Sequence, residues 1–207
     1  MNNSSVTFWF PTRALLCSLV LLFMIQATAM GQTLKYEAFH LGRKVGSLTV
    51  TREVSDERTK IKVDVDIRGK LKPRGASQFE THSTYMDQKL IEAQGISKWD
   101  SNLNSLIAIY LNKDRYYLEK GELVIGMEPI DLLSTDIFYF EEPLKIKQAV
   151  HITSGDILTI ERKEDVPASY TFTGPRIKIV HHYKAGKLTA FMWQLYDEII
   201  TFRLKNN

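Results

Sequence analysis

The sequence is 207 residues long, with 44% hydrophobic residues, 27 Lys plus Arg, 24 Asp plus Glu and a formal net charge of +3 at pH 7. This near balance, with the basic residues scattered along the chain, gives no basis for nucleic acid or an anionic membrane surface as a partner. The single cysteine, Cys17, lies in an N-terminal apolar run, so no disulfide framework is expected.

That apolar run has the features of a secretory signal peptide. Arg13 precedes an uninterrupted apolar stretch at residues 14–25, which is too short to span a bilayer, and small residues follow it. We expect cleavage between Gly31 and Gln32, and cleavage between Ala29 and Met30 is the alternative. Residues 1–31 are therefore predicted to be a signal peptide that is removed.

Residues 32–207 would then form the mature chain, which is long enough for one domain with a substantial core. Because it contains no cysteine, this chain must depend on its core for stability, which favours the periplasm over the extracellular medium. We expect export through the signal peptide and no transmembrane segment in the mature chain.

Apolar and polar residues alternate with a period of two through almost the whole mature chain. In the stretch IKVDVDI, at residues 61–67, four aliphatic side chains point to one face and three charged side chains to the other, as in a strand with one face in water. Turn signals recur about every 8 to 12 residues. We therefore predict an all-β single domain that forms an antiparallel barrel, a half-barrel or a strongly curved sheet. The expected strands are 34–40, 45–54, 61–67, 77–86, 90–99, 105–112, 115–119, 122–125, 149–154, 157–161, 170–173, 177–183, 188–193 and 199–204.

One short helix, at about residues 131–141, interrupts this pattern. Asp131 is expected to cap it, and Pro143 to end it by restricting the residue before it. On an α-helix, Asp136 and Tyr139 would lie off the apolar face. That face would consist of Leu133, Ile137 and Phe140.

The last long hairpin has the clearest predicted register. With residues 184–187 in the loop, Tyr183 lies opposite Leu188, and the next pairs inward are His181 with Ala190, Ile179 with Met192, and Lys178 with Trp193. In this register both faces of the hairpin carry large apolar groups, because Phe191 and Trp193 lie on the face opposite His181. Something must therefore cover the second face, and the short helix is the expected cover.

Three stretches together resemble an uncharacterised secreted bacterial family, DUF6134, which is similar in style to DUF3108. They are Val45-Gly46-Ser47 in the first hairpin, Tyr139-Phe140-Glu141-Glu142-Pro143 at the helix, and Tyr183-Lys184-Ala185-Gly186 in the last hairpin. The resemblance covers residues 34–204. It implies an envelope-targeted β fold and no reaction. The corner from Gly69 to Gly75 departs from the family by its extra proline and glycine, which leaves the strand order there open.

No catalytic residue and no cofactor is predicted. The mature chain lacks cysteine and a G-x-S-x-G turn, and adjacent carboxylates such as Glu141 and Glu142 rarely converge on one bond. No metal site is predicted either, because His181 and His182 are neighbours on a strand and point to opposite faces. We expect a partly buried His181 and an exposed His182.

The aromatic residues remain as candidates for ligand binding. They are Phe138, Tyr139, Phe140, Phe191 and Trp193. These side chains would either fill the core, as a helix that plugs a barrel requires, or line a pocket for an apolar ligand. The first hypothesis is a non-enzymatic exported protein that binds a lipid or another hydrophobic or amphipathic small molecule in a β-barrel. The alternative is a structural or assembly module that binds another envelope protein.

Overall fold

The structure is a computed structural model that describes residues 30–55, 57–68, 77–127, 131–195 and 198–205. The predicted corner at 69–75 and most of the predicted signal peptide lie outside these residues. The first strand begins at Met30, two residues before the expected mature start. Its first two residues, Met30 and Gly31, pair with Val54 and Glu53.

The described residues form one antiparallel sheet of fourteen strands, and each expected strand is found. The order across the sheet is β8-β7-β6-β5-β4-β3-β2-β1-β14-β13-β12-β11-β10-β9. The strands are β1 (Met30–His40), β2 (Arg43–Ser55), β3 (Arg58–Ile67), β4 (Ser77–Met86), β5 (Lys89–Trp99), β6 (Asn102–Asn112), β7 (Arg115–Lys120), β8 (Leu123–Met127), β9 (Gln148–His151), β10 (Asp156–Arg162), β11 (Ser169–Thr173), β12 (Ile177–Lys184), β13 (Lys187–Leu195) and β14 (Glu198–Leu204).

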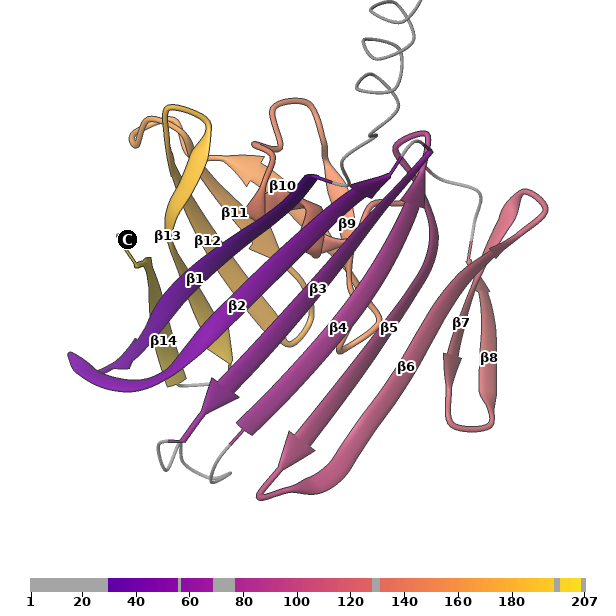
Figure 1. Cartoon of the computed structure of the whole chain (residues 1–207), viewed down its shortest axis with the longest axis horizontal. Coiled ribbons are helices and arrows are strands. Elements are labelled where there is room, and N and C mark those ends of the chain that lie inside the picture. The colour runs from indigo at the N-terminus through magenta and orange to yellow at the C-terminus, as the bar shows by residue number, and fades with distance from the viewer. Residues whose placement is uncertain (1–29, 56, 69–76, 128–130, 196–197, 206–207) are drawn as a thin grey trace, which may run out of the picture.

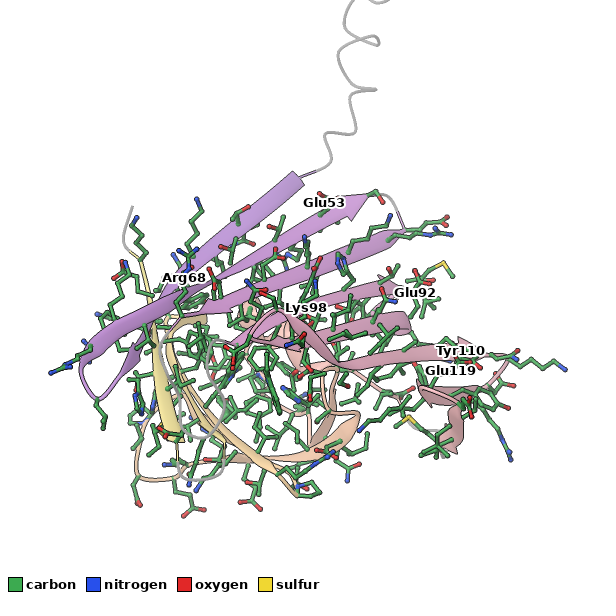
Figure 2. The ribbon with its side chains drawn as sticks, turned by 90° about the horizontal axis from the view of Figure 1, so that it is seen from below. Glu53, Arg68, Glu92, Lys98, Tyr110 and Glu119 are labelled. Atoms are coloured by element: carbon green, nitrogen blue, oxygen red, sulfur yellow. The ribbon has the colours of Figure 1, made fainter. Side chains whose placement is uncertain are left out.

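The sheet curves back on itself, so that the layer β1–β6 faces the layer β9–β14 across a filled interior (Figures 1 and 2). No strand pairing between β8 and β9 closes it, which makes it an open half-barrel and confirms the predicted all-β class. Side-chain packing closes part of the gap. A Cβ atom at Gly95 of β5 would lie 2.9 Å from the carbonyl oxygen of Ile152, and one at Gly155 would lie 2.5 Å from Leu118 of β7.

Alternation along the strands places the core between the two layers. In β3, Ile61, Val63, Val65 and Ile67 are all buried, as predicted. On the outer face Lys62 lies 3.2 Å from Asp64 and 3.1 Å from Glu80. At the far end of the front layer, the Tyr110 hydroxyl of β6 donates to Glu119 of β7 (Figure 2). The charged face is solvated, and such exposed pairs add little stability.

The predicted short helix is present as a 3₁₀-helix, η1 (Thr135–Tyr139), and its cap is not Asp131. Ser134 caps it, because its side-chain oxygen accepts a hydrogen bond from the backbone N–H of Asp136. The backbone before Ser134 is extended, since the Leu133 carbonyl accepts from the N–H of Val150 in β9 and Ser134 forms a parallel bridge with Val150. The prediction placed the helix start three residues too early because this tertiary pairing was not foreseen.

The helix is buried on all sides, which the prediction of one apolar face did not anticipate. In a 3₁₀-helix, residues three apart lie on the same side, so Asp136 and Tyr139 face the same region of the interior. Both are buried. The predicted α-helical stripe assumed 3.6 residues per turn. The segment is a plug inside the half-barrel, which is one of the two roles expected for its aromatic side chains.

Two tyrosines fix this plug to both layers. From β4, the Tyr85 hydroxyl lies 2.6 Å from the Ser134 side-chain oxygen and accepts from the Ser134 backbone N–H. From β12, the Tyr183 hydroxyl donates to the carbonyl of Phe138 at 2.6 Å. Both hydroxyls are buried, where an unmade hydrogen bond is costly. The ends of the helix are therefore held by side chains far from it in sequence.

The register predicted for the last hairpin is correct at the loop and wrong beyond it. Tyr183 pairs with Leu188, but His181 pairs with Phe191 and Ile179 with Trp193. A β-bulge between His182 and Tyr183 shifts the pairing by one residue.

The shift brings the large side chains of the hairpin to one face. Phe191 and Trp193 lie inward with His181, and all three are buried. Lys178 pairs with Gln194, not with Trp193. The predicted placement of Phe191 and Trp193 on a second face is therefore wrong, because it assumed a regular ladder; Val180 is the buried residue of that face.

The plug should depend on Tyr85 for stability. Tyr85→Phe removes a buried hydroxyl and leaves the Ser134 N–H without its partner, so we expect a loss of about 1–3 kcal/mol in the free energy of unfolding. Urea denaturation measures it. The matched control is Tyr110→Phe, which removes a hydrogen bond to Glu119 at a part-buried site and should cost about 0.5 kcal/mol or less. Equal losses in the two variants would show that the Tyr85 contact stabilises the protein no more than the part-buried Tyr110 hydrogen bond does.

Candidate functional site

A cavity of about 180 Å³ lies between the two layers, beside the plug. Strands β3 to β7, the plug, the β9–β10 turn, the β11–β12 loop, β12 and β13 all contribute to its wall. The lining residues are Val63, Val65, Phe79, Thr81, Ser97, Trp99, Asn104, Ser105, Lys120, Thr135, Asp136, Tyr139, His151, Ile152, Thr153, Ser154, Asp156, Arg176, Ile177, Ile179, His181 and Trp193.

Of the five predicted aromatic residues, two line this cavity. They are Tyr139 of the plug and Trp193 of β13. Their rings belong to one aromatic cluster, because each packs on Phe191, with ring centroids 5.4 Å away for Tyr139 and 5.9 Å for Trp193. The curved sheet therefore brings together two residues that are more than fifty positions apart.

The other three predicted residues lie elsewhere. Phe138 packs against Phe172 of β11 in the core, with ring centroids 5.5 Å apart. Phe191 is fully buried and stacks on Phe202 of β14 at 4.4 Å. Phe140 is half-buried beneath the Arg52 guanidinium, which lies 4.7 Å from the ring centroid. These contacts are structural, the first two in the core and the third a cation–π contact.

The cavity wall contains a buried carboxyl group, that of Asp136. The Thr81 hydroxyl of β4 donates to its Oδ2 atom at 2.6 Å, and only 5% of the residue is exposed. Burial raises the pKa of Asp136 to about 6, against the smaller lowering effect of the Thr81 hydrogen bond. The group is therefore mostly ionised above neutral pH although it lies in the interior.

Two histidines also line the cavity. His181 of β12 is buried, and its Nδ1 atom lies 3.1 Å from the Tyr183 hydroxyl. Burial lowers the pKa of His181 to about 3. His151, at the end of β9, has its Nδ1 atom 3.0 Å from the Ser154 hydroxyl, and burial lowers its pKa to about 4. Both rings are neutral at physiological pH.

The remaining wall combines apolar and polar side chains, and its exposed residues mark the mouth. Asn104 of β6, Lys120 of β7 and Arg176 of the β11–β12 loop are exposed. Arg176 makes a bidentate ion pair with Asp156, with its Nη2 atom 2.9 Å from Oδ1 and its Nε atom 3.3 Å from Oδ2. The mouth is thus charged, and the wall behind it combines apolar side chains with polar ones such as Thr81, Ser97 and Thr135. Concave sites that combine apolar surface with placed polar groups are typical of small-molecule binding.

Sequence reasoning missed the polar part of this site. Asp136 was treated as a residue off the apolar face of an α-helix, and His181 as a partly buried sheet residue. The available signal was a lone carboxylate directly before the apolar run IFYF, at a position where a plug must bury every side chain. His151 gave no signal, because its partial burial depends on the β9–β10 turn. His182 is half-exposed, on the face opposite His181.

The other groups considered for chemistry lie away from the cavity. Glu141 is exposed and lies 3.5 Å from Arg52, and Glu142 accepts a hydrogen bond from Tyr170 at 2.8 Å. Among the described residues, no group of three or more His, Cys, Asp or Glu side chains could hold a metal ion. Within the same residues, no helix has the length and hydropathy needed to cross a bilayer.

The buried carboxyl group should leave a signature in the pH dependence of stability. The folded pKa of Asp136, about 6, exceeds the ordinary value of 3.8. The contribution of Asp136 to the free energy of unfolding is therefore fully present below pH 3.8 and is lost as the pH rises through 6. Asp136→Asn should gain about 2–3 kcal/mol relative to the native protein between these limits. Urea unfolding at both pH values measures the difference.

His181 and His151 act in the opposite direction, because their folded pKa values are lowered. Their contribution to the free energy of unfolding is present above pH 6.5 and is lost as the pH falls. They are common to both proteins, so their effect cancels in the comparison. Parallel stability curves for Asp136→Asn and the native protein would contradict the assignment of Asp136 as a buried titrating group.

Comparison with known proteins places this fold among β-barrel-like domains. The chain is similar to the crystal structure of a beta-barrel-like protein of a domain of unknown function, DUF1849, from Brucella abortus. The TM-score is 0.53 and the sequence identity 8%, over 86% of this chain and 96% of that one. At this identity the likeness concerns the fold alone. No curated protein matches the chain.

The family resemblance drawn from the three motifs is confirmed. The family model described as a domain of unknown function, DUF6134, matches residues 36–204. This range contains the β1–β2 hairpin, the plug with its Glu-Pro end and the β12–β13 hairpin. The chain therefore belongs to the DUF6134 family.

Proposed function

We propose that this chain is an exported, non-enzymatic protein that binds one small amphipathic molecule in the cavity beside the plug. The observation that carries the proposal is the cavity itself, whose wall combines apolar and polar side chains, with a charged mouth and two buried titratable residues, Asp136 and His181. A half-barrel that served only as a scaffold could fill this space with larger side chains. Export rests on the N-terminal apolar run, and the periplasm is the compartment that we favour.

The size of the cavity limits the ligand. An engineered apolar cavity of about 150 Å³ holds one benzene molecule. A cavity of about 180 Å³ therefore suits a single ring or a chain of roughly six carbon atoms. A long-chain lipid would have to leave most of its chain outside. Within the ligand class predicted from the sequence, small amphiphiles fit better than whole lipids.

The alternative, an assembly module, would need an exposed aromatic face or a free sheet edge, and the structure removes the first and offers the second. Phe191 and Trp193 are buried, so the last hairpin offers no aromatic docking face. The edge strand β8, however, exposes three consecutive apolar residues, Leu123, Val124 and Ile125. An edge strand of this kind can pair with a strand of another protein. This observation favours strand addition at β8 as the second candidate function.

One experiment separates the two candidates. The protein is purified gently from its own cell envelope and its mass is measured by native mass spectrometry before and after solvent extraction. A reproducible mass excess that is extracted as a small amphiphile supports the cavity proposal. A second polypeptide, or a multiple of the chain mass, supports assembly. A bare chain that also fails to bind added amphiphiles contradicts the cavity proposal.

The cavity should bind a six-carbon amphiphile in a manner that depends on its volume. Val65→Phe adds a ring at a cavity wall in β3, so we expect the affinity for 1-hexanol to fall by about tenfold or more. Isothermal titration calorimetry measures the affinity, and Trp193 fluorescence reports the same event from the wall. The control is Val54→Phe, because Val54 is 39% exposed on β2. Equal affinities in the two variants would place 1-hexanol outside the cavity.

A further inference from the structure

The hydrogen bonds around His181 fix which of its ring nitrogens carries the proton. The Tyr183 hydroxyl has one proton, and its two carbonyl neighbours, Phe138 at 2.6 Å and Glu141 at 3.2 Å, can only accept it. Towards His181 the hydroxyl oxygen must therefore accept, so the Nδ1 atom at 3.1 Å bears the hydrogen. The ring is neutral, so Nε2 is left with a lone pair as a hydrogen-bond acceptor.

That Nε2 acceptor has no protein donor. In the part of the chain that the structure describes, the Tyr183 hydroxyl is the one hydrogen-bond partner of the His181 ring. The residue is 2% exposed and lines the cavity. An acceptor cut off from every donor costs about 1–3 kcal/mol, so in this cavity water or a bound molecule supplies the hydrogen.

Asp136 presents a second acceptor to the same cavity. The Thr81 hydroxyl uses its Oδ2 atom, and the Asp136 backbone N–H turns away to the Ser134 oxygen. Across the described residues, no hydrogen bond reaches Oδ1 and no Lys, Arg or His side chain forms an ion pair with this carboxylate. A buried carboxylate is retained at such a cost when a cation or several donors can complete it.

The two acceptors belong to one region of the wall. Tyr139 follows Asp136 by three residues and so lies on the same side of the 3₁₀-helix, and its ring centroid is 6.1 Å from that of His181. The Tyr139 hydroxyl adds one donor to this wall. A negative carboxylate and a neutral nitrogen acceptor remain in the interior, and the positive charges of the wall, Lys120 and Arg176, belong to its exposed mouth.

We propose that the small molecule held in this cavity carries a primary ammonium group, which donates to Oδ1 of Asp136 and Nε2 of His181. An ammonium group has three donors and one positive charge, so it can satisfy both acceptors and neutralise the carboxylate. A hydroxyl group has one donor and no charge. A carboxylate would meet two acceptors and be repelled. This inference rests on the proposed function, because it names the head group of the ligand in that cavity.

The test compares three probes with the same six-carbon chain, namely hexylamine, 1-hexanol and hexanoate. Calorimetric titration of the full mature protein at a pH of about 7.5 keeps Asp136 ionised. We expect hexylamine to bind about tenfold more tightly than 1-hexanol, and hexanoate to bind more weakly than either, because charge-assisted hydrogen bonds are the stronger ones. This comparison needs no variant, so it stands even where a substitution impairs folding.

Substitution of Asp136 then tests whether its carboxylate causes the preference for hexylamine over 1-hexanol. Asp136→Asn keeps the shape and removes the charge, so the affinity for hexylamine should fall to within about twofold of that for 1-hexanol, which should not change. The control is Asp131→Asn, an exposed carboxylate five positions earlier, which should leave all three affinities unchanged.

The outcomes separate the two proposals. Binding of 1-hexanol without a preference for hexylamine, or a preference that survives Asp136→Asn, overturns the ammonium inference and leaves the cavity function standing. Tighter binding of hexanoate than of hexylamine also overturns it. Failure of all three probes to bind overturns the cavity function, and the ammonium inference with it.

Discussion

The buried hydrogen bonds from Tyr85 and Tyr183 to the plug are the contacts on which the rest of the structure depends. One tyrosine comes from the front layer and the other from the back layer, and each bonds to one end of η1. Without them, the short 3₁₀-helix would not be stable, because a helix of one or two turns is unstable alone. The plug keeps the two layers apart on one side, and the cavity is the space that it leaves between them.

A single β-bulge has a comparable influence on the site. The extra residue between His182 and Tyr183 moves Phe191 and Trp193 to the inner face, where the first stacks in the core and the second lines the cavity. A regular ladder would place both rings outside and leave an apolar surface on the molecule. The bulge also sets His181 among aromatic rings, which explains why its burial is nearly complete and why its pKa is low.

The interior thus combines tight packing with polar groups whose hydrogen bonds the described residues do not complete. Gly95 allows the chain after β9 to approach the backbone of β5, which closes part of the open sheet without hydrogen bonds between strands. Beside this contact, Asp136 and His181 keep acceptors that the described residues do not satisfy. A protein selected for stability alone would gain from apolar residues at these positions. Water or a bound molecule must therefore supply the missing donors at that place.

The sequence by itself determined the strands, the single curved sheet, the family and the presence of a short helix before Pro143, because these features depend on local alternation and turn residues. It predicted Tyr139 and Trp193 near one another but not the cavity that they line. Only the tertiary structure decided the helix type, its cap at Ser134, the bulge after His182, the burial of Asp136 and the partial burial of His151. Each of these depends on partners from distant strands, such as Tyr85 and Val150, and no local pattern encodes such a contact.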